Sequence, residues 1–158
     1  MGSQLVGEAR TGWSEVIRLF LYGSLRHGGG NDRLLPGARV PAMTGPGWTM
    51  YEFAGGAYPV MMPSGATAPV FGEVIDVNID SPDFRAVEHM EVGAGYNLTP
   101  LRVALIGPGG VTECVAYTFA YFHPDDDWIG APVPGGDWLA HTGYVRSPEE
   151  RLYRDAGL

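Results

Sequence analysis

The sequence predicts an α+β fold, a small mixed β-barrel or strongly curved sheet with a few flanking helices. Glycine and proline make up 37 of the 158 residues, roughly double their usual share. They lie between short apolar stretches, an arrangement typical of turns that connect strands. The length fits one domain, and 45% of the residues are hydrophobic, enough for a core. We expect a flexible tail over residues 1–15 and a single domain over residues 16–158.

Apolar and alternating stretches predict five or six short strands, most of them joined by hairpin-type turns. They cover residues 16–22, 48–53, 58–62, 69–79, 101–106 and 111–122. Only Arg18 interrupts the first stretch, so we expect this strand to be central in the sheet. The last two stretches flank a Gly-Pro-Gly-Gly turn at residues 107–110 and predict a β-hairpin.

Two segments carry helix-start signals. Ser81 and Pro82 combine a serine cap with proline at the first helical position. This helix is expected to run through Glu91 and to stop at Gly93 or Gly95, because glycine is favoured just past a helix end. Residues 147–150 read Ser-Pro-Glu-Glu, a capping box that predicts a last helix ending at Gly157.

The charged residues exclude several function classes. The chain has 10 basic and 18 acidic residues, a net charge of −8, so we expect no nucleic-acid partner. All the basic residues are arginine, which excludes Schiff-base chemistry on lysine, pyridoxal-phosphate attachment and a phosphate-binding P-loop. A single cysteine, Cys114, excludes a disulfide framework and a cysteine-rich zinc site.

The apolar stretches are too short and too often interrupted to cross a membrane. The first 15 residues have neither a basic start nor an apolar middle, so they do not resemble a signal peptide. We therefore expect a soluble, cytoplasmic protein.

Glu91 is the most informative position for chemistry. On a helix that begins at Pro82 it follows Phe84 and Val87 at helical spacing, with Met90 beside them, so it points into the core or a cleft. It also lies in the last turn, where the helix dipole disfavours negative charge. Burial and dipole would both raise its pKa toward the range of a general acid–base. The alternative is a frayed last turn that rotates Glu91 into water.

Residues Tyr22 to Leu25 form a second candidate site. A buried strand that ends in Gly23 exposes consecutive backbone N–H groups, which can bind an oxygen atom. Ser24 adds a hydroxyl group and Tyr22 an aromatic wall. The alternative is an ordinary strand-to-loop turn.

Two other patterns do not support a site. Residues 27–30 read His-Gly-Gly-Gly, as in lipase-like hydrolases, but the chain lacks the Gly-x-Ser-x-Gly segment that this chemistry requires. His123 with the aspartates at 125–127 could hold a hard cation, although adjacent aspartates in a loop usually form a solvated turn. We therefore expect no metal.

Several motifs occur in a fixed order along the chain. Residues 19–26 read Leu-Phe-Leu-Tyr-Gly-Ser-Leu-Arg. The later segments are Tyr58-Pro59, Phe71-Gly72-Glu73-Val74, Val87-Glu88-His89-Met90-Glu91 with Gly95-Tyr96, Ala116-Tyr117, and Pro134-Gly135-Gly136-Asp137-Trp138. Together they resemble the motifs of the gamma-glutamylcyclotransferase-like family and cover roughly residues 17–138. Each motif is short, and it is their common order that makes the resemblance specific.

The resemblance implies a small mixed barrel and a specific reaction. Such enzymes cleave a gamma-glutamyl amide by attack of its own alpha-amine on its gamma-carbonyl, which releases 5-oxoproline and a free amine. By motif, Glu91 would accept and then donate the proton, and Tyr22, Gly23, Ser24 and Leu25 would bind the glutamyl head. Tyr96 and Tyr117 match pocket tyrosines. No metal or cofactor is implied, and the partner is a small gamma-glutamyl amide.

Two departures leave the amine half of the substrate open. Val92 follows Glu91 where the family commonly has glycine, and Asn97 follows Tyr96 where it usually has arginine. A non-catalytic small-molecule binding protein on the same fold is therefore a second hypothesis, with Glu91 as a buried ligand anchor. A third, a hydrolase centred on Ser24, has no assigned base.

Overall fold

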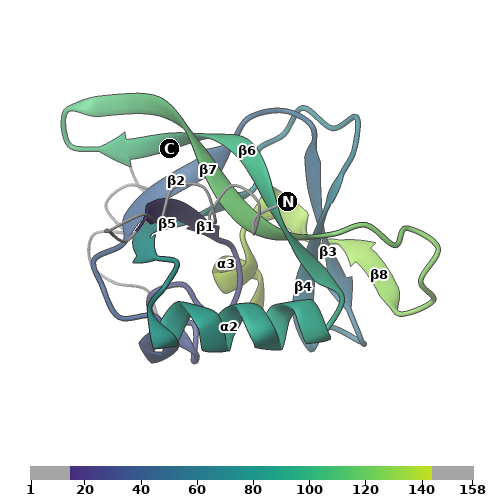
Figure 1. The fold of residues 1–158 in the computed structure, drawn as a ribbon. Helices are drawn as coiled ribbons and strands as arrows, with labels where there is room; N and C mark the ends of the chain where they lie inside the picture. The colour runs from purple at the N-terminus through teal and green to yellow at the C-terminus, as the bar shows by residue number, and fades with distance from the viewer. Residues whose placement is uncertain (1–14, 144–158) are drawn as a thin grey trace.

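A computed structural model of the chain describes residues 15–143. These residues form a closed five-stranded barrel in the order β1-β5-β2-β6-β7 and a three-stranded sheet in the order β4-β3-β8 (Figure 1). The barrel strands are β1 (Val16–Leu21), β2 (Val40–Thr44), β5 (Phe71–Asn78), β6 (Tyr96–Gly107) and β7 (Gly110–Tyr121). The second sheet contains β3 (Trp48–Phe53), β4 (Tyr58–Pro63) and β8 (Ile129–Pro132). The predicted α+β fold with a mixed barrel is confirmed.

The first strand is central, as its apolar sequence predicts. β1 pairs antiparallel with β5 along its whole length and parallel with β7 at Leu19 and Tyr117. Two side chains reinforce the parallel junction, because Thr118 Oγ1 donates to the Phe20 carbonyl at 2.9 Å and Tyr22 Oη donates to the Phe119 carbonyl at 2.5 Å. This junction closes the barrel and fixes the end of β1, where the site loop begins.

Helix α2 (Pro82–Gly93) starts at the predicted cap and runs beneath the barrel toward β4 (Figure 1). Ser81 Oγ accepts a hydrogen bond from the Phe84 amide at 3.2 Å, and Phe84 and Val87 are buried against the core. Met90, expected beside them, is 46% exposed. The apolar face of α2 therefore ends at Val87, and the last turn of the helix lies at the surface rather than in the core.

Several short elements lie outside the predicted set. They are strands β2 and β8, the 3-10 helix η2 (Pro134–Gly136) and helix α3 (Trp138–Thr142). A further 3-10 helix, η1 (Asp32–Leu34), follows the loop after β1. β6 begins at Tyr96, five residues before the predicted start, because its long hairpin with β7 pairs residues 96–107 with residues 110–121 despite Pro100. The predicted helix over residues 147–157 and most of the predicted tail lie outside the described residues.

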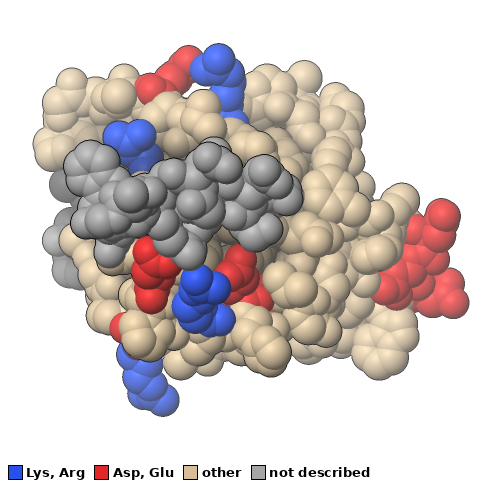
Figure 2. Space-filling view, viewed as in Figure 1, with Lys and Arg blue, Asp and Glu red and all other residues tan. Residues whose placement is uncertain are grey.

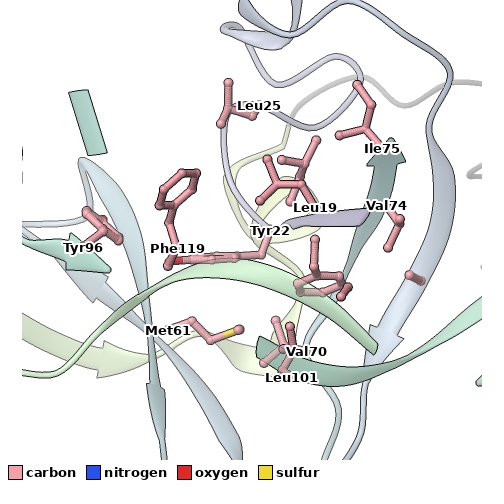
Figure 3. Packing of buried hydrophobic residues seen from close by; sticks show 14 of the residues in the cluster. Leu19, Tyr22, Leu25, Met61, Val70, Val74, Ile75, Tyr96, Leu101 and Phe119 are labelled. Atoms are coloured by element: carbon pink, nitrogen blue, oxygen red, sulfur yellow. The ribbon is translucent and has the colours of Figure 1, made fainter. Parts of the chain in front are cut away.

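Buried apolar side chains from both sheets and α2 form one core. Figure 3 shows Leu19, Tyr22 and Phe119 together near the centre of this cluster, with Tyr96 at its edge. β5 is buried on both faces over residues 72–75, which includes the carboxylate of Glu73. Across residues 15–143, no helix is long and apolar enough to span a membrane.

Candidate functional site

A pocket of about 290 Å³ opens beside the end of β1, the start of β4 and the last turn of α2. The loop after β1 provides one wall, the aromatic side chains a second and the helix end a third. Its polar and aromatic lining residues include Tyr22, Ser24, Asn31, Tyr58, Glu91, Tyr96 and Phe119. The sequence motifs at residues 22–25, 58–59 and 87–96 therefore meet at one place in the fold.

Glu91 lies in this pocket and not in open water. Its side chain is partly buried at the end of α2, and burial raises the pKa of the carboxyl group from 4.5 to about 7. No basic residue lies in the last turn of the helix to offset the negative charge. A carboxyl group with this pKa exchanges protons readily near neutral pH, which is what a general acid–base requires.

Two tyrosines beside Glu91 are fixed by hydrogen bonds to backbone carbonyls. Tyr22 Oη donates to Phe119, and Tyr96 Oη donates to the Pro59 carbonyl at 2.8 Å. The pKa of each tyrosine is raised, mainly by burial and further by the neighbouring Glu91 charge. Both hydroxyl groups therefore stay protonated and act as rigid donors that join the pocket wall to β7 and β4.

The loop of residues 22–31, called the site loop below, is tightly folded. The Arg26 amide donates to the Gly23 carbonyl at 3.1 Å, and the Asn31 amide donates to the Ser24 carbonyl at 2.9 Å. Asn31 Nδ2 also donates to Ser24 Oγ at 2.9 Å. A side chain on Gly23 would come within 3.1 Å of the Pro59 ring, so glycine permits β4 to approach the loop.

The structure brings six of the seven residues singled out from the sequence into the pocket, and leaves the seventh outside. Tyr117 lines a different depression, with Arg18 and Asp76 on neighbouring strands. On the same face of β7, Phe119 reaches the pocket, and the Tyr121 ring lies 5.6 Å from the Tyr96 ring. Tyr58 and Asn31 also line the pocket and are not among these seven, although the Tyr58-Pro59 motif is a signal for Tyr58.

A second cavity of about 460 Å³ adjoins the pocket. The two share Ser24, Asn31, Tyr58 and Pro59, and the second extends along the glycines of the site loop toward Trp138 and Thr142. The site therefore has room for a ligand with two parts, one beside Glu91 and one beyond Tyr58.

Acidic side chains gather over the connection between β7 and β8, at the right of the molecule in Figure 2. In that connection Asp126 accepts hydrogen bonds from Tyr121 Oη at 2.5 Å and from the Trp128 amide at 2.9 Å, as in an ordinary turn. Within the described part of the chain, no three His, Cys, Asp or Glu side chains are grouped so that they could hold a metal ion.

Comparisons with solved structures show the same fold at low identity. An Arabidopsis thaliana protein is 17% identical with a TM-score of 0.57, covering 94% of this chain and 87% of its own. A mouse AIG2-like protein is 21% identical with a TM-score of 0.55, covering 74% and 86%. A yeast gamma-glutamyl cyclotransferase specific to glutathione is 11% identical with a TM-score of 0.57, covering 86% and 90%. No curated protein matches the sequence.

The family comparison covers most of the described residues. The model of the family "Gamma-glutamyl cyclotransferase, AIG2-like" matches residues 19–140, from β1 to α3. This stretch contains the site loop, Glu91 and Tyr96, and it supports a gamma-glutamyl cyclotransferase-type function. The chain belongs to the gamma-glutamyl cyclotransferase, AIG2-like family.

Proposed function

We propose that this protein cleaves a small gamma-glutamyl amide to 5-oxoproline and a free amine, with Glu91 as the general base and then the general acid. The observation that carries the proposal is the Glu91 carboxyl group, with a pKa of about 7, in a pocket that the site loop also lines. A small soluble substrate and a cytoplasmic setting fit this reaction.

The proton steps need one carboxyl group and no water. Ionised Glu91 takes a proton from the alpha-amine as its nitrogen attacks the gamma-carbonyl carbon and closes the five-membered ring. The protonated carboxyl group then donates to the leaving nitrogen as the original amide C–N bond breaks. Such proton transfer is typically worth about 10²–10⁴-fold in rate.

The other pocket residues would position the substrate. Because the reaction is intramolecular, its rate depends on holding the glutamyl chain folded with the amine near the carbonyl carbon. We assign the backbone amides of Gly23, Ser24 and Leu25 to a substrate oxygen, as preorganised donors. Tyr22 and Tyr96 close the apolar side, and the cavity beyond Tyr58 would receive the amine half.

The test is 5-oxoproline release, measured by mass spectrometry, from a panel of gamma-glutamyl amides. The panel contains gamma-glutamyl amino acids, epsilon-gamma-glutamyl-lysine and gamma-glutamyl alkylamines. We expect release from at least one member, and the preferred member defines the amine. No release from any of them by folded protein would reject the proposed reaction for these substrates.

The pH dependence of kcat/KM should reflect the ionisation of Glu91. A base must be ionised, so kcat/KM is expected to rise about tenfold per pH unit below its inflection and to level off above about pH 7. Rates between pH 5 and 8.5 on the preferred amide test this expectation. An inflection near 4.5, the ordinary value for a glutamate, would show that the group in use is not a buried carboxyl.

Tyr96 and Tyr117, which both match pocket tyrosines of the family, should behave differently. Tyr96→Phe removes the donor to Pro59 and loosens the β4 wall, so we expect kcat/KM to fall about tenfold. Tyr117→Phe makes the same chemical change outside the pocket and should stay within about twofold of wild type. Equal losses in steady-state assays of both variants would contradict the placement of the site.

A further inference from the structure

A buried ionic cluster lies against the site loop, and none of its members lines the pocket. Arg26, in the loop, is 3% exposed; Glu73, on β5, is 1% exposed; and Asp137, just before α3, is 7% exposed. Arg26 Nη1 lies 3.0 Å from Asp137 Oδ1, and Arg26 Nε lies 3.6 Å from Glu73 Oε2. Arg39 Nε lies 4.0 Å from Glu73 Oε1. Two carboxylates and two guanidinium groups thus face one another within the fold.

The cluster holds the backbone of the site loop at several points. Glu73 Oε1 accepts a hydrogen bond from the His27 amide at 2.8 Å. Arg39 Nη2 donates to the Leu25 carbonyl at 2.9 Å and to the Asp32 carbonyl at 2.8 Å. The carboxylate therefore binds the loop directly through His27 and indirectly through both arginines.

Asp137 extends the same cluster to helix α3. Its Oδ1 accepts from the Ala140 amide at 3.1 Å as the cap of α3, while it also faces Arg26. Segments 71–74 and 134–138 each carry a sequence motif, yet both lie away from Glu91 and contribute a carboxylate that meets Arg26. The feature that these two segments share is contact with the site loop.

We propose that Glu73 and Asp137 are positioning residues that fix the site loop in the conformation that binds substrate, a role that rests on the proposed function. Burying ionic groups is costly, and apolar side chains of similar size often give equal or greater stability. Because the buried carboxylate of Glu73 need not be the most stabilising choice on β5, its main role is to fix the site loop in one conformation. A shift of about 1 Å in such a geometry can cost about 10²-fold in rate.

The first test is Glu73→Gln. The amide oxygen still accepts from the His27 amide, whereas the negative charge between Arg26 and Arg39 is lost. We expect kcat/KM to fall at least about tenfold, with the inflection near pH 7 unchanged because Glu91 is untouched. Glu73→Asp keeps the charge and should recover part of the loss. Asp137→Asn, which retains a capping side chain on α3, should lower kcat/KM in the same direction and serves if Glu73→Gln does not fold.

The matched control is Val103→Ala, which creates a small cavity at a buried position of β6. Val103 does not line the pocket. Val103 is not a member of the ionic cluster, and the lost methyl groups should lower the melting temperature. We therefore expect kcat/KM, measured well below the melting temperatures, to stay within about twofold of wild type. If Glu73→Gln loses no more kcat/KM than this control does, the cluster serves stability alone and the proposal is overturned.

A second readout does not depend on turnover. The Gly29 amide donates to the Arg26 carbonyl at 2.8 Å and the Asn31 amide to Ser24, so both report on the loop. In Glu73→Gln, NMR hydrogen exchange at these amides should be about tenfold faster than in wild type, with no such change in the control. Unchanged exchange would overturn the positioning role. If wild type releases no 5-oxoproline, the proposed function fails and exchange alone decides the proposal about the loop.

Discussion

Replacing Glu91 by glutamine is expected to lower kcat for 5-oxoproline release by about 10²–10⁴-fold while substrate affinity changes only a few-fold. Glutamine has nearly the same size but cannot take the proton from the alpha-amine or return it to the leaving nitrogen. Single-turnover kinetics give the rate, and calorimetric binding of the intact gamma-glutamyl amide to the variant gives the affinity. Full turnover by the variant would reject the role of Glu91.

The same substitution should lower activity but raise the free energy of unfolding. A gain in stability would show that the loss of activity does not come from unfolding of the variant. Burial raises the pKa of Glu91 from 4.5 to about 7, so the ionised form is disfavoured in the folded protein. This group's contribution to stability is full below about pH 4.5 and is lost as the pH rises through 7. Glutamine carries no such penalty, so the variant should be more stable at pH 8 by up to about 3 kcal/mol. A binding protein on this fold would show the same gain in stability, bind the amide, and release no 5-oxoproline in either form.

Gly72→Ala is expected to destabilise the protein by at least about 3 kcal/mol. A Cβ at this position of β5 would overlap the Leu21 carbonyl oxygen and come within 2.8 Å of the Phe20 ring. The Leu21 carbonyl belongs to β1, which pairs with β5 along its whole length, so it cannot move away without breaking that pairing. Urea unfolding followed by circular dichroism gives the free energy of unfolding.

Gly65→Ala is the control for this substitution. A Cβ there meets nothing within 4 Å, and the backbone of Gly65 does not have a positive φ. Its free energy of unfolding should stay within about 0.5 kcal/mol of wild type. If Gly72→Ala proved equally tolerated, β1 and β5 would not approach each other as closely as the structure shows.

The sequence predicts the elements whose signals are long or strongly capped. The strands at residues 48–53 and 58–62, the β6–β7 hairpin and the cap at Ser81 are confirmed by the structure. β2 and β8 have five and four residues with a proline in each, too few to show an alternating pattern. They form because neighbouring strands pair with them, and the sequence of a short segment does not reveal its pairing partners.

The residues that line the candidate pocket were predictable where a single helix or strand determines their position. They were less predictable where a distant element decides which side chains are covered. Glu91 and residues 22–25 follow from the helix and from the strand end, and both lie at the pocket. Tyr117 shares a strand face with Phe119, and alternation alone cannot distinguish them. Phe119 is covered because the ring of Phe84 on α2 stacks on it, with centroids 6.3 Å apart, whereas Tyr117 remains partly exposed. The members of the ionic cluster come from four separate segments, so no local motif revealed their contact.

The parallel junction of β1 with β7 also has a consequence for folding. Thr118 and Phe20 are 98 residues apart in sequence, and Tyr22 and Phe119 are 97 apart. Such contacts give a high contact order, which slows folding, because a long segment of chain must be ordered before the contact forms. During synthesis, β1 is made before β7, and the barrel cannot close until β7 is also available. Residues 22–25 therefore gain their partners in the pocket only after most of the chain has left the ribosome, so binding of a substrate reports completed folding of the whole barrel.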